Sequence, residues 1–532
     1  MANPKSPAGG RPRPLIALGY LACVAAFAIA CAQFHLPGKG FTFLLTFGGG
    51  ESARYLPELR HLPRYEAPDS AGYDAQYYSQ IAMHPRLGDP EIRAAVDDLP
   101  YRARRILFCW TAYGLAGGNP ARALQIYAVQ NIVCWFVLGF VLLRWFPATT
   151  WGNFFRWAGV MASAGLCFSV RGSLVDGPSL LLIAIAIALE ETGRRWWAAG
   201  VLGISGLARE TNLLAGAALL SPAETKSGRR GVTVLRGLVA ILPLALWMVC
   251  LRAWVGSSHA ELGNFGWPFA AYFSQWRDVI AHFSKPDAGL VPLWRALILV
   301  ALLAQWVFFA VRREPQQTWW RVGAAYALLM VFLGKPVWEG YPGAAARVLL
   351  PMLLAFNVLV PRRRAWLPLL LAGNLTLLFS FDAFEPPGGI DSQVKGPAAV
   401  IANANTGEAV SVRFDEHDWF SPERTRWSFW RWSRGSAGVV LHNPQPFPVT
   451  AEISFAVSSN SPRSLHVKLR DRTLWQGSLT REPAALKFPG IELPPGDTVC
   501  RFETDEPGAM PNQRDARALA IRVQNFTLRL TK

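Results

Sequence analysis

The sequence predicts an α-helical polytopic membrane protein with about 10 to 11 transmembrane helices and a C-terminal, jelly-roll-like all-β sandwich. Two observations point to this fold class. Of the 532 residues, 52% are hydrophobic and only 17% are charged, whereas a soluble domain typically carries about 25% charged residues. The apolar residues also gather in long runs up to position 381, and short alternating segments follow them.

The basic excess of the chain has a structural explanation in a membrane protein. A net charge of +17 would suggest nucleic-acid binding in a soluble chain, but loops rich in Lys and Arg remain in the cytoplasm when a membrane protein inserts. We therefore expect membrane lipids, and no nucleic acid, among the partners. No disulfide framework is predicted, because most cysteines lie in apolar runs (Cys23, Cys31, Cys134, Cys167 and Cys250).

The first apolar run, residues 15–32, follows a short basic segment and is about one bilayer crossing long. It predicts a retained signal anchor. A cleaved signal peptide is the alternative, because residues 28–31 resemble a lipoprotein cleavage site. The further runs, several of them short for a crossing, are residues 124–143, 158–170, 178–189, 198–220, 234–255, 294–311, 322–333, 348–360 and 367–381.

The basic loops predict the orientation of the chain. They lie on one side, the cytoplasm, only if the run 198–220 enters the membrane and returns to the same side. Arg209-Glu210-Thr211 interrupts this run, which predicts two half-helices that meet at a polar turn. The protein is then a multi-pass protein of the cell (inner) membrane with a cytoplasmic N-terminus. The segments placed outside are residues 34–105, 171–177, 256–292, 334–347 and the C-terminal tail.

The C-terminal tail predicts an antiparallel β-sandwich. Residues 449–457, 464–469, 473–479 and 518–530 alternate or are rich in β-branched side chains. Trp419, Trp427, Trp430 and Trp432 either fill its core or stack on sugar rings. We expect a transmembrane domain at 1–384, a linker at 385–398 that contains Pro386-Pro387-Gly388-Gly389, and an extracytoplasmic sandwich at 399–532.

The outer loop 34–105 is too long for a simple connection and predicts a functional loop. In its segment 72–82, Tyr78 and Ile81 have helical spacing, which places Asp74 near the start of a helix at the membrane surface. A carboxylate there can accept a proton from a hydroxyl group, bind a divalent cation, or simply cap the helix. Farther along, the basic segment 101–107 either binds an anion or reaches outer-leaflet phosphates.

Three further groups of ionisable residues fall within or beside apolar runs. A charge at the centre of a span costs about 2.5 to 3.5 kcal/mol, so these charges are expected to be paired or functional. All map to the same outer side as Asp74, which predicts one outward-facing polar cavity. The groups are Arg171 with Asp176, Arg209 with Glu210, and Lys335 with Glu339 and Arg347.

These motifs resemble a known family. The segments 72–82 and 101–107 look like the first-loop signature of bacterial members of the GT-C glycosyltransferase superfamily, and are distantly similar to the GPI mannosyltransferases. Arg209-Glu210-Thr211 resembles the Lys/Arg-Glu-Thr turn of the bacterial group, and residues 346–351 resemble its late Arg-x-x-x-Pro element. The resemblance covers about residues 15 to 380.

The resemblance implies an enzyme that moves a hexose or pentose from a polyprenyl-phosphate-linked donor to an extracytoplasmic hydroxyl of an envelope glycan or glycolipid. It implies that Asp74 is the catalytic acidic residue, that Asp176 is a second-loop acidic group, and that Arg209 and Arg347 bind the donor phosphate. Further residues expected to bind donor or substrate are Arg102, Arg105, Glu210, Tyr77, Tyr78, Lys335 and Glu339.

The sequence departs from the family at two positions. Tyr73 replaces the Trp of the eukaryotic signature, and no second acidic residue stands beside Asp74, so a divalent cation remains an open cofactor with Asp74 as its one candidate ligand. Two other classes stay open: a flippase or transporter of lipid-linked glycans, and a non-catalytic membrane protein that binds envelope polysaccharide. A membrane acyltransferase is a weaker alternative, because the outer loops show no His-rich signature.

Overall fold

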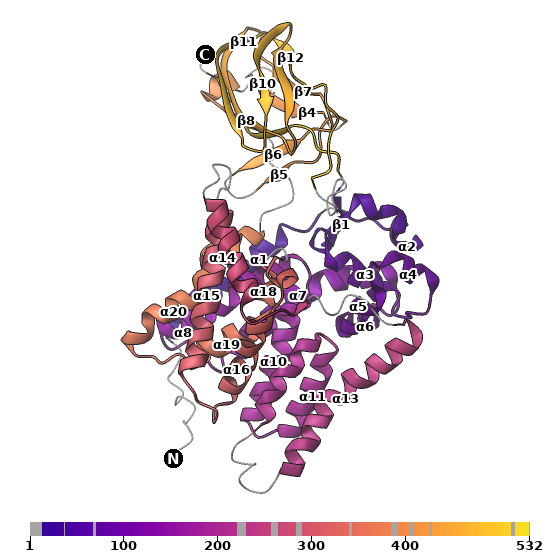
Figure 1. The fold of residues 1–532 in the computed structure, drawn as a ribbon, viewed down its shortest axis with the longest axis vertical. Coiled ribbons are helices and arrows are strands. Elements are labelled where there is room, and N and C mark those ends of the chain that lie inside the picture. Colours follow the sequence, from indigo (N-terminus) through magenta and orange to yellow (C-terminus); the bar gives the residue numbers. More distant parts are fainter. Residues whose placement is uncertain are drawn as a thin grey trace.

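A computed structural model shows a helical domain that carries a separate β domain at one end, with the N-terminal end of the chain at the other (Figure 1). The structure describes residues 13–36, 38–67, 71–220, 230–256, 264–283, 290–339, 343–384, 392–401, 403, 409–415, 417–424, 428–511 and 517–530. The expected linker motif at 386–389, Trp427, and the basic stretches 1–12 and 226–229 lie outside these residues.

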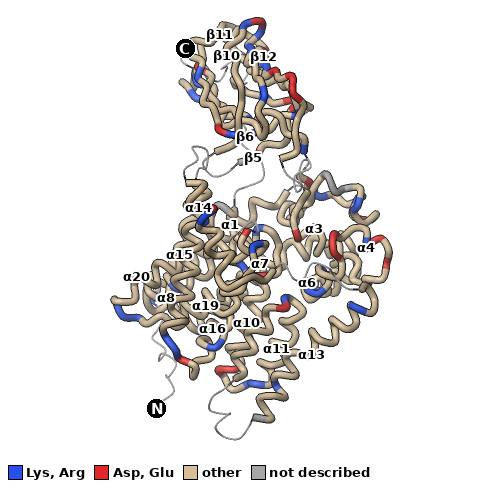
Figure 2. The backbone as a smooth tube through the Cα atoms, viewed as in Figure 1, with Lys and Arg blue, Asp and Glu red and all other residues tan. Residues whose placement is uncertain are grey.

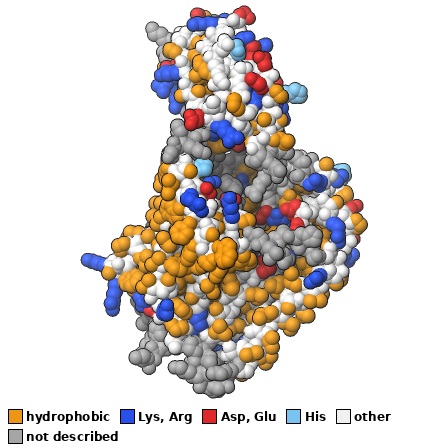
Figure 3. Space-filling view, viewed as in Figure 1, with side chains coloured by type: hydrophobic (Ala, Val, Ile, Leu, Met, Phe, Trp, Pro, Cys, Tyr) orange, Lys and Arg blue, Asp and Glu red, His pale blue; other side chains and the backbone are white. Residues whose placement is uncertain are grey.

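Long apolar helices establish the helical domain as a membrane domain. Among the described residues, four helices are long and apolar enough to cross a bilayer, or five if a pair of helices bent by 42° at residue 374 forms one span. Large apolar side chains are exposed along these helices, and they cover much of the helical domain in Figure 3. The four are α1 (Pro14–Ala32), α7 (Pro120–Leu142), α13 (Arg230–Trp254) and α15 (Val291–Val311).

The first helix packs into the helical domain as an integral part of it. Phe27 of α1 stacks on Trp135 of α7 with ring centroids 3.6 Å apart, and the Tyr20 hydroxyl donates a hydrogen bond to the carbonyl of Phe146. Ile16, Tyr20 and Phe27 are buried in the main hydrophobic core. The retained signal anchor stays a prediction.

The remaining apolar runs form shorter or broken helices. The run 158–170 is divided between two helices because Ser163 ends one and caps the next, its hydroxyl accepting from the backbone N–H of Leu166. The run 198–220 breaks at Arg209, as expected. The elements are α8 (Trp151–Met161), α9 (Ala164–Arg171), α10 (Asp176–Glu191), α11 (Arg195–Gly206), η4 (Glu210–Leu219), α16 (Thr318–Phe332), α19 (Leu350–Leu359), α20 (Leu367–Gly373) and η7 (Leu375–Phe384).

The outer loop packs around a second hydrophobic core, which it shares with residues of α6, α7 and α13. Buried amides organise it: the Gln76 side chain accepts from the backbone N–H of Gly48 and from the Tyr55 hydroxyl, and Gln80 accepts from the N–H of Leu56. Its elements are η1 (Thr42–Leu45), β1 (Phe47–Gly48), η2 (Gly49–Arg54), α2 (Pro57–His61), β2 (Glu66–Ala67), α3 (Asp74–Met83), α4 (Pro90–Ala95), α5 (Leu99–Arg102) and η3 (Ala103–Arg105), and α6 (Leu107–Leu115) follows.

Two further predicted outer segments, residues 256–292 and 334–347, contain three helices that hydropathy does not indicate. One helix, α14 (Ala270–Phe283), carries Arg277, Asp278 and His282, so its apolar residues do not form a continuous run. The short helices α17 (Lys335–Glu339) and α18 (Ala344–Val348) follow α16 and lead into α19. In Figure 1, α14 lies at the end of the helical domain that carries the β domain.

The β domain is the predicted sandwich of two sheets. One has the order β10–β9–β12–β7–β4 and the other β11–β8–β13–β6–β5, with β3 parallel to β13. Trp419 is buried between them, and its indole donates to the carbonyl of Gly438, which favours the core over sugar stacking for this residue. The strands are β3 (Gln393–Lys395), β4 (Ser411–Phe414), β5 (Glu423–Arg424), β6 (Phe429–Trp432), β7 (Ala437–Asn443), β8 (Val449–Ser458), β9 (Arg463–Leu469), β10 (Arg472–Leu479), β11 (Ala484–Leu493), β12 (Gly496–Glu503) and β13 (Arg522–Leu530).

Candidate active site

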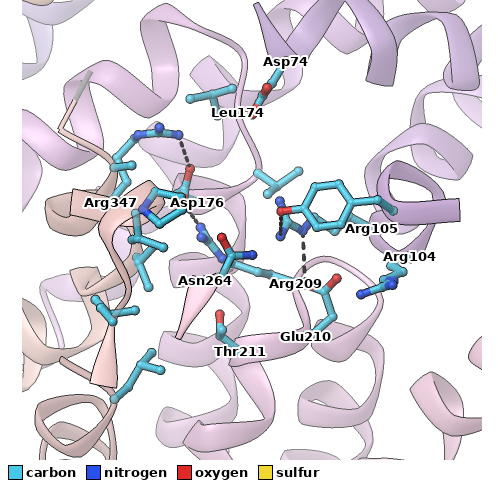
Figure 4. A pocket seen from close by; sticks show the side chains of 18 of the residues that line it. Asp74, Arg104, Arg105, Leu174, Asp176, Arg209, Glu210, Thr211, Asn264 and Arg347 are labelled. Atoms are coloured by element: carbon cyan, nitrogen blue, oxygen red, sulfur yellow. Dashed lines mark hydrogen bonds and ion pairs between the residues drawn. The ribbon is translucent and has the colours of Figure 1, made fainter. Parts of the chain in front are cut away.

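A cavity of about 420 Å³ brings together charged residues from distant parts of the chain (Figure 4). Its walls come from α3, η3, the start of α10, the break before η4, the segment 264–265, α16 with the start of α17, and α18. This is the convergence that the sequence predicts. The charged and hydroxyl side chains that line it are Tyr73, Asp74, Tyr78, Tyr101, Arg104, Arg105, Asp176, Arg209, Glu210, Thr211 and Arg347.

Asp74 is the first residue of α3, and its side chain is about one-third exposed (32%). The helix is capped by the backbone of Tyr73 without a side-chain bond, so Asp74 is not the N-cap residue. Its Oδ1 forms an ion pair with Nη1 of Arg102 at 2.9 Å, and the residue lines the cavity. The carboxylate is therefore both oriented by the protein and accessible from the cavity.

Arg102 positions this carboxylate and does not line the cavity. Its Nε and Nη2 donate to both oxygens of Asp97 at 3.0 and 2.8 Å, and its guanidinium lies 5.0 Å from the ring centre of Tyr77. Burial alone would lower the pKa of Arg102, but the hydrogen bonds to Asp97 and the charge of Asp74 raise it overall, so Arg102 stays charged. Arg102 is thus paired with two carboxylates, Asp74 and Asp97, and the ring of Tyr77 lies beside its guanidinium group.

Arg105 connects the outer loop to the broken run. Its Nε donates to Glu210 Oε2 at 3.1 Å, and its two terminal nitrogens donate to the hydroxyls of Tyr78 at 3.2 Å and Tyr101 at 3.4 Å. The predicted residues Arg105, Tyr78 and Glu210 therefore form one network on one wall of the cavity.

On the opposite wall, Asp176 is a buried counter-ion for two arginines. Its side chain is 2% exposed, its Oδ1 pairs with Arg209, and its Oδ2 pairs with Nη1 of Arg347 at 3.2 Å. Arg347 also donates from Nη2 to the hydroxyl of Tyr73 at 3.0 Å. A buried carboxylate held by two guanidinium groups is poorly placed to accept a proton, so Asp176 orients the arginines.

The cavity has a small excess of positive charge. Four arginines (Arg104, Arg105, Arg209 and Arg347) and three carboxylates (Asp74, Asp176 and Glu210) line it. Guanidinium groups are well suited to phosphate because they present paired N–H donors. The arrangement can therefore hold an anionic phosphate group and, a short way off, place a carboxylate beside a reacting hydroxyl.

Four of the predicted site residues do not line the cavity: Arg102 and Tyr77, described above, and Lys335 and Glu339. Lys335 and Glu339 form an ion pair with each other at 3.2 Å, with side chains 64% and 37% exposed, and neither lines this cavity. Conversely, Tyr73, Tyr101, Arg104 and Thr211 line the cavity but are not among the predicted site residues. Each is adjacent in sequence to a predicted residue or motif, and this adjacency is the sequence feature by which it could have been found.

The site does not fit a divalent cation in its present arrangement. In the part of the chain that the structure describes, no three His, Cys, Asp or Glu side chains gather as a metal site. The one candidate ligand, Asp74, is engaged by a guanidinium group. We therefore derive no chemical step through a metal ion.

Comparisons with known proteins give only remote likenesses. No family model and no curated protein matches the chain. Among solved structures, the crystal structure of ArnT from Cupriavidus metallidurans is 13% identical, with 67% of this chain and 62% of that chain covered and a TM-score of 0.38. The arabinosyltransferase EmbB from Mycobacterium smegmatis is 11% identical, with coverages of 98% and 66% and a TM-score of 0.26. The chain thus spans less than two thirds of either protein.

Proposed function

We propose that this protein is an inner-membrane glycosyltransferase that moves a sugar from a polyprenyl-phosphate-linked donor to an extracytoplasmic acceptor hydroxyl. The observation that carries the proposal is the joint presence of the Asp74 carboxylate and the guanidinium groups of Arg105, Arg209 and Arg347 around one cavity. The resemblance of residues 72–82 and 209–211 to the GT-C family supports the same reaction.

The chemistry balances with these residues alone. Asp74 takes the proton of the acceptor hydroxyl, whose oxygen forms a bond to the anomeric carbon of the donor sugar. The bond between that carbon and the phosphate oxygen breaks, and polyprenyl phosphate leaves with the bonding electron pair. Arg209 and Arg347 stabilise the charge that develops on the leaving phosphate, because their counter-ion Asp176 fixes both before the substrate arrives.

The distribution of charge supports an extracytoplasmic site. Figure 2 shows Lys and Arg gathered near α20 and below α16 and α11, at the end of the helical domain where the N-terminus lies. By the positive-inside rule this end faces the cytoplasm. The outer loop and the β domain lie toward the opposite end (Figure 1). A lipid-linked donor would present its phosphate there while its tail remains in hydrocarbon.

The test is release of polyprenyl phosphate by the full-length protein in proteoliposomes. Undecaprenyl-phosphate-linked hexoses and pentoses are supplied as donors with extracted envelope glycan as acceptor, and products are followed by mass spectrometry. Asp74→Asn should lower release by about 10²- to 10⁴-fold, as expected for loss of a general base. Asp89→Asn, in the same loop but paired with His84 and outside the cavity, is the matched control.

Two outcomes would contradict the proposal. Undiminished release by Asp74→Asn would exclude this carboxylate as the base. Movement of the lipid-linked sugar across the bilayer with no release of polyprenyl phosphate would instead indicate a flippase.

A further inference from the structure

A second cavity of about 310 Å³ lies between α14, α15, α17 and α18. Ile298 and Leu299 of α15 form an apolar part of its wall. In Figure 1, α14 and α15 lie on the side of the helical domain below the β domain. The side chains that can form hydrogen bonds into the cavity are Gln275, Asp278, His282, Arg295, Trp338 and Glu339.

The segment that contains α17 and α18 separates this cavity from the candidate active site. Pro336 and Val337 line the active-site cavity, whereas the next two residues, Trp338 and Glu339, line the second cavity. At α18, Ala344 lines the first and Ala345 the second. The two cavities therefore share a wall only one chain segment thick.

Two polar side chains of the second cavity have no hydrogen-bond partner among the described residues. Gln275 is 6% exposed, and its amide forms no hydrogen bond with another described residue. Trp338 is 8% exposed, and within the described part of the chain its indole N–H has no acceptor. An unpaired buried polar group costs about 1–3 kcal/mol, so a ligand that accepts from the Trp338 N–H would recover this cost.

The charge of the second cavity differs from that of the first. Two carboxylates, Asp278 and Glu339, and one guanidinium group, Arg295, line it, and Lys335 pairs with Glu339 at 3.2 Å, so these charged groups leave no positive excess. This balance disfavours a phosphate group. A mixture of donors and acceptors beside an indole ring and aliphatic side chains suits a sugar, which presents hydroxyl groups at its edge and C–H groups on its faces.

We propose that the second cavity binds a neutral sugar residue of the glycan acceptor, at a position away from the hydroxyl that reacts. This inference rests on the proposed glycosyl transfer, since it assigns the acceptor to one side of the α17–α18 wall and the donor phosphate to the other. Gln275 and the Trp338 N–H hydrogen-bond the sugar, and the side chains of α15 contact its apolar face.

The test uses direct binding to the full-length protein in nanodiscs. The probes are the methyl glycosides of glucose, galactose, mannose, N-acetylglucosamine and arabinofuranose, observed by saturation-transfer NMR. At least one should bind the wild type, and Gln275→Leu and Trp338→Phe should each weaken that binding by about fivefold to tenfold, the value of one hydrogen bond. Arg277→Ala, an exposed neighbour on α14 outside the cavity, is the control.

A thermal-unfolding midpoint separates binding from folding. Trp338→Phe keeps an aromatic ring against Tyr272, whose ring centre lies 5.4 Å from that of Trp338, and removes only an unpaired donor. Its midpoint should equal or exceed that of the wild type while binding weakens. A photoreactive diazirine derivative of the bound glycoside should label wild-type peptides that contain Gln275 or Trp338.

Three results would overturn the inference: no glycoside binds the wild type, binding survives both variants, or the diazirine labels α3 and η3 instead. The variant Asp74→Asn separates the two proposals. It should bind the glycoside normally, because Asp74 lines the other cavity. If glycoside binding is confirmed and polyprenyl phosphate is never released, the cavity assignment holds and the proposed reaction fails.

Discussion

The hydroxyl of Tyr73 accepts a hydrogen bond from Arg347, and this contact gives a reason for tyrosine where the eukaryotic first-loop signature has tryptophan. An indole N–H can only donate, so tryptophan would leave the guanidinium group without this acceptor. Burial raises the pKa of Tyr73, so the phenol stays protonated over the physiological range.

Replacement of this hydroxyl tests its effect on the donor. Tyr73→Phe should raise the KM for the lipid-linked donor about fivefold with kcat little changed, because loss of one hydrogen bond loosens Arg347. Tyr113→Phe, a tyrosine that does not line the cavity, should leave both constants unchanged. A fall in kcat at constant KM would instead assign Tyr73 to the chemical step. Steady-state release of polyprenyl phosphate measures both.

Single residues were predictable from sequence where an apolar environment makes a charge conspicuous. Asp176, Arg209 and Arg347 stand out for this reason, and the structure brings them to one cavity with Asp74. The outer loop gave no such contrast, because several of its arginines and carboxylates are close in sequence. The ion pair between Arg102 and Asp97 depends on the local fold of α5, which cannot be predicted from hydropathy.

At the level of elements, the position of Arg347 depends on close packing of α18 against α9. A Cβ atom on Gly165 of α9 would lie 2.7 Å from the carbonyl oxygen of Ala346, a contact that forces the two helices apart. Backbone atoms cannot yield as a flexible side chain can. The glycine is therefore a packing requirement that lies beside the active site without lining it.

The variant Gly165→Ala should lower stability by about 1–3 kcal/mol through overpacking, and should reduce transfer by displacing Arg347. The matched control is Gly200→Ala in α11, where an added Cβ meets nothing within 4 Å. There the gain in helix propensity should raise stability by up to about 1 kcal/mol. Thermal unfolding in detergent measures both effects. Equal midpoints for the two variants would contradict the packing argument.

Sequence periodicity predicted the strands β8, β9, β10 and β13 of the sandwich and most apolar helices, but not the other strands or where the helices end. The run 158–170 is one segment by hydropathy, and the break at Ser163 comes from a capping bond. The helix α14 escaped prediction because its charged residues interrupt the apolar pattern. Two of these residues, Asp278 and His282, line the second cavity.

For the whole molecule, separate hydrophobic cores in the helical domain and in the sandwich, together with an uneven charge distribution, define the architecture. The sandwich has its own core, separate from those of the helical domain. Because the basic loops lie toward the N-terminal end, we expect the β domain to be extracytoplasmic (Figure 2).

Reporter fusions test this orientation. Alkaline phosphatase fused after Lys532 should be active, since the enzyme requires an oxidising, extracytoplasmic compartment, and green fluorescent protein there should be dark. A phosphatase fusion after Arg195, in a basic loop, should be inactive. The reverse pattern would place the cavity on the cytoplasmic side.

The break in the run 198–220 has one more consequence. Arg209 reaches Asp176 on one side, and the next residue, Glu210, accepts from Arg105 on the other. Exchanging Arg209 and Glu210 would preserve amino-acid composition, hydropathy and formal charge. It would, however, place a carboxylate beside Asp176 and an arginine beside Arg105. The charge pairing at the site therefore depends on the order of Arg209 and Glu210 in the sequence. Composition, hydropathy and net charge do not depend on that order.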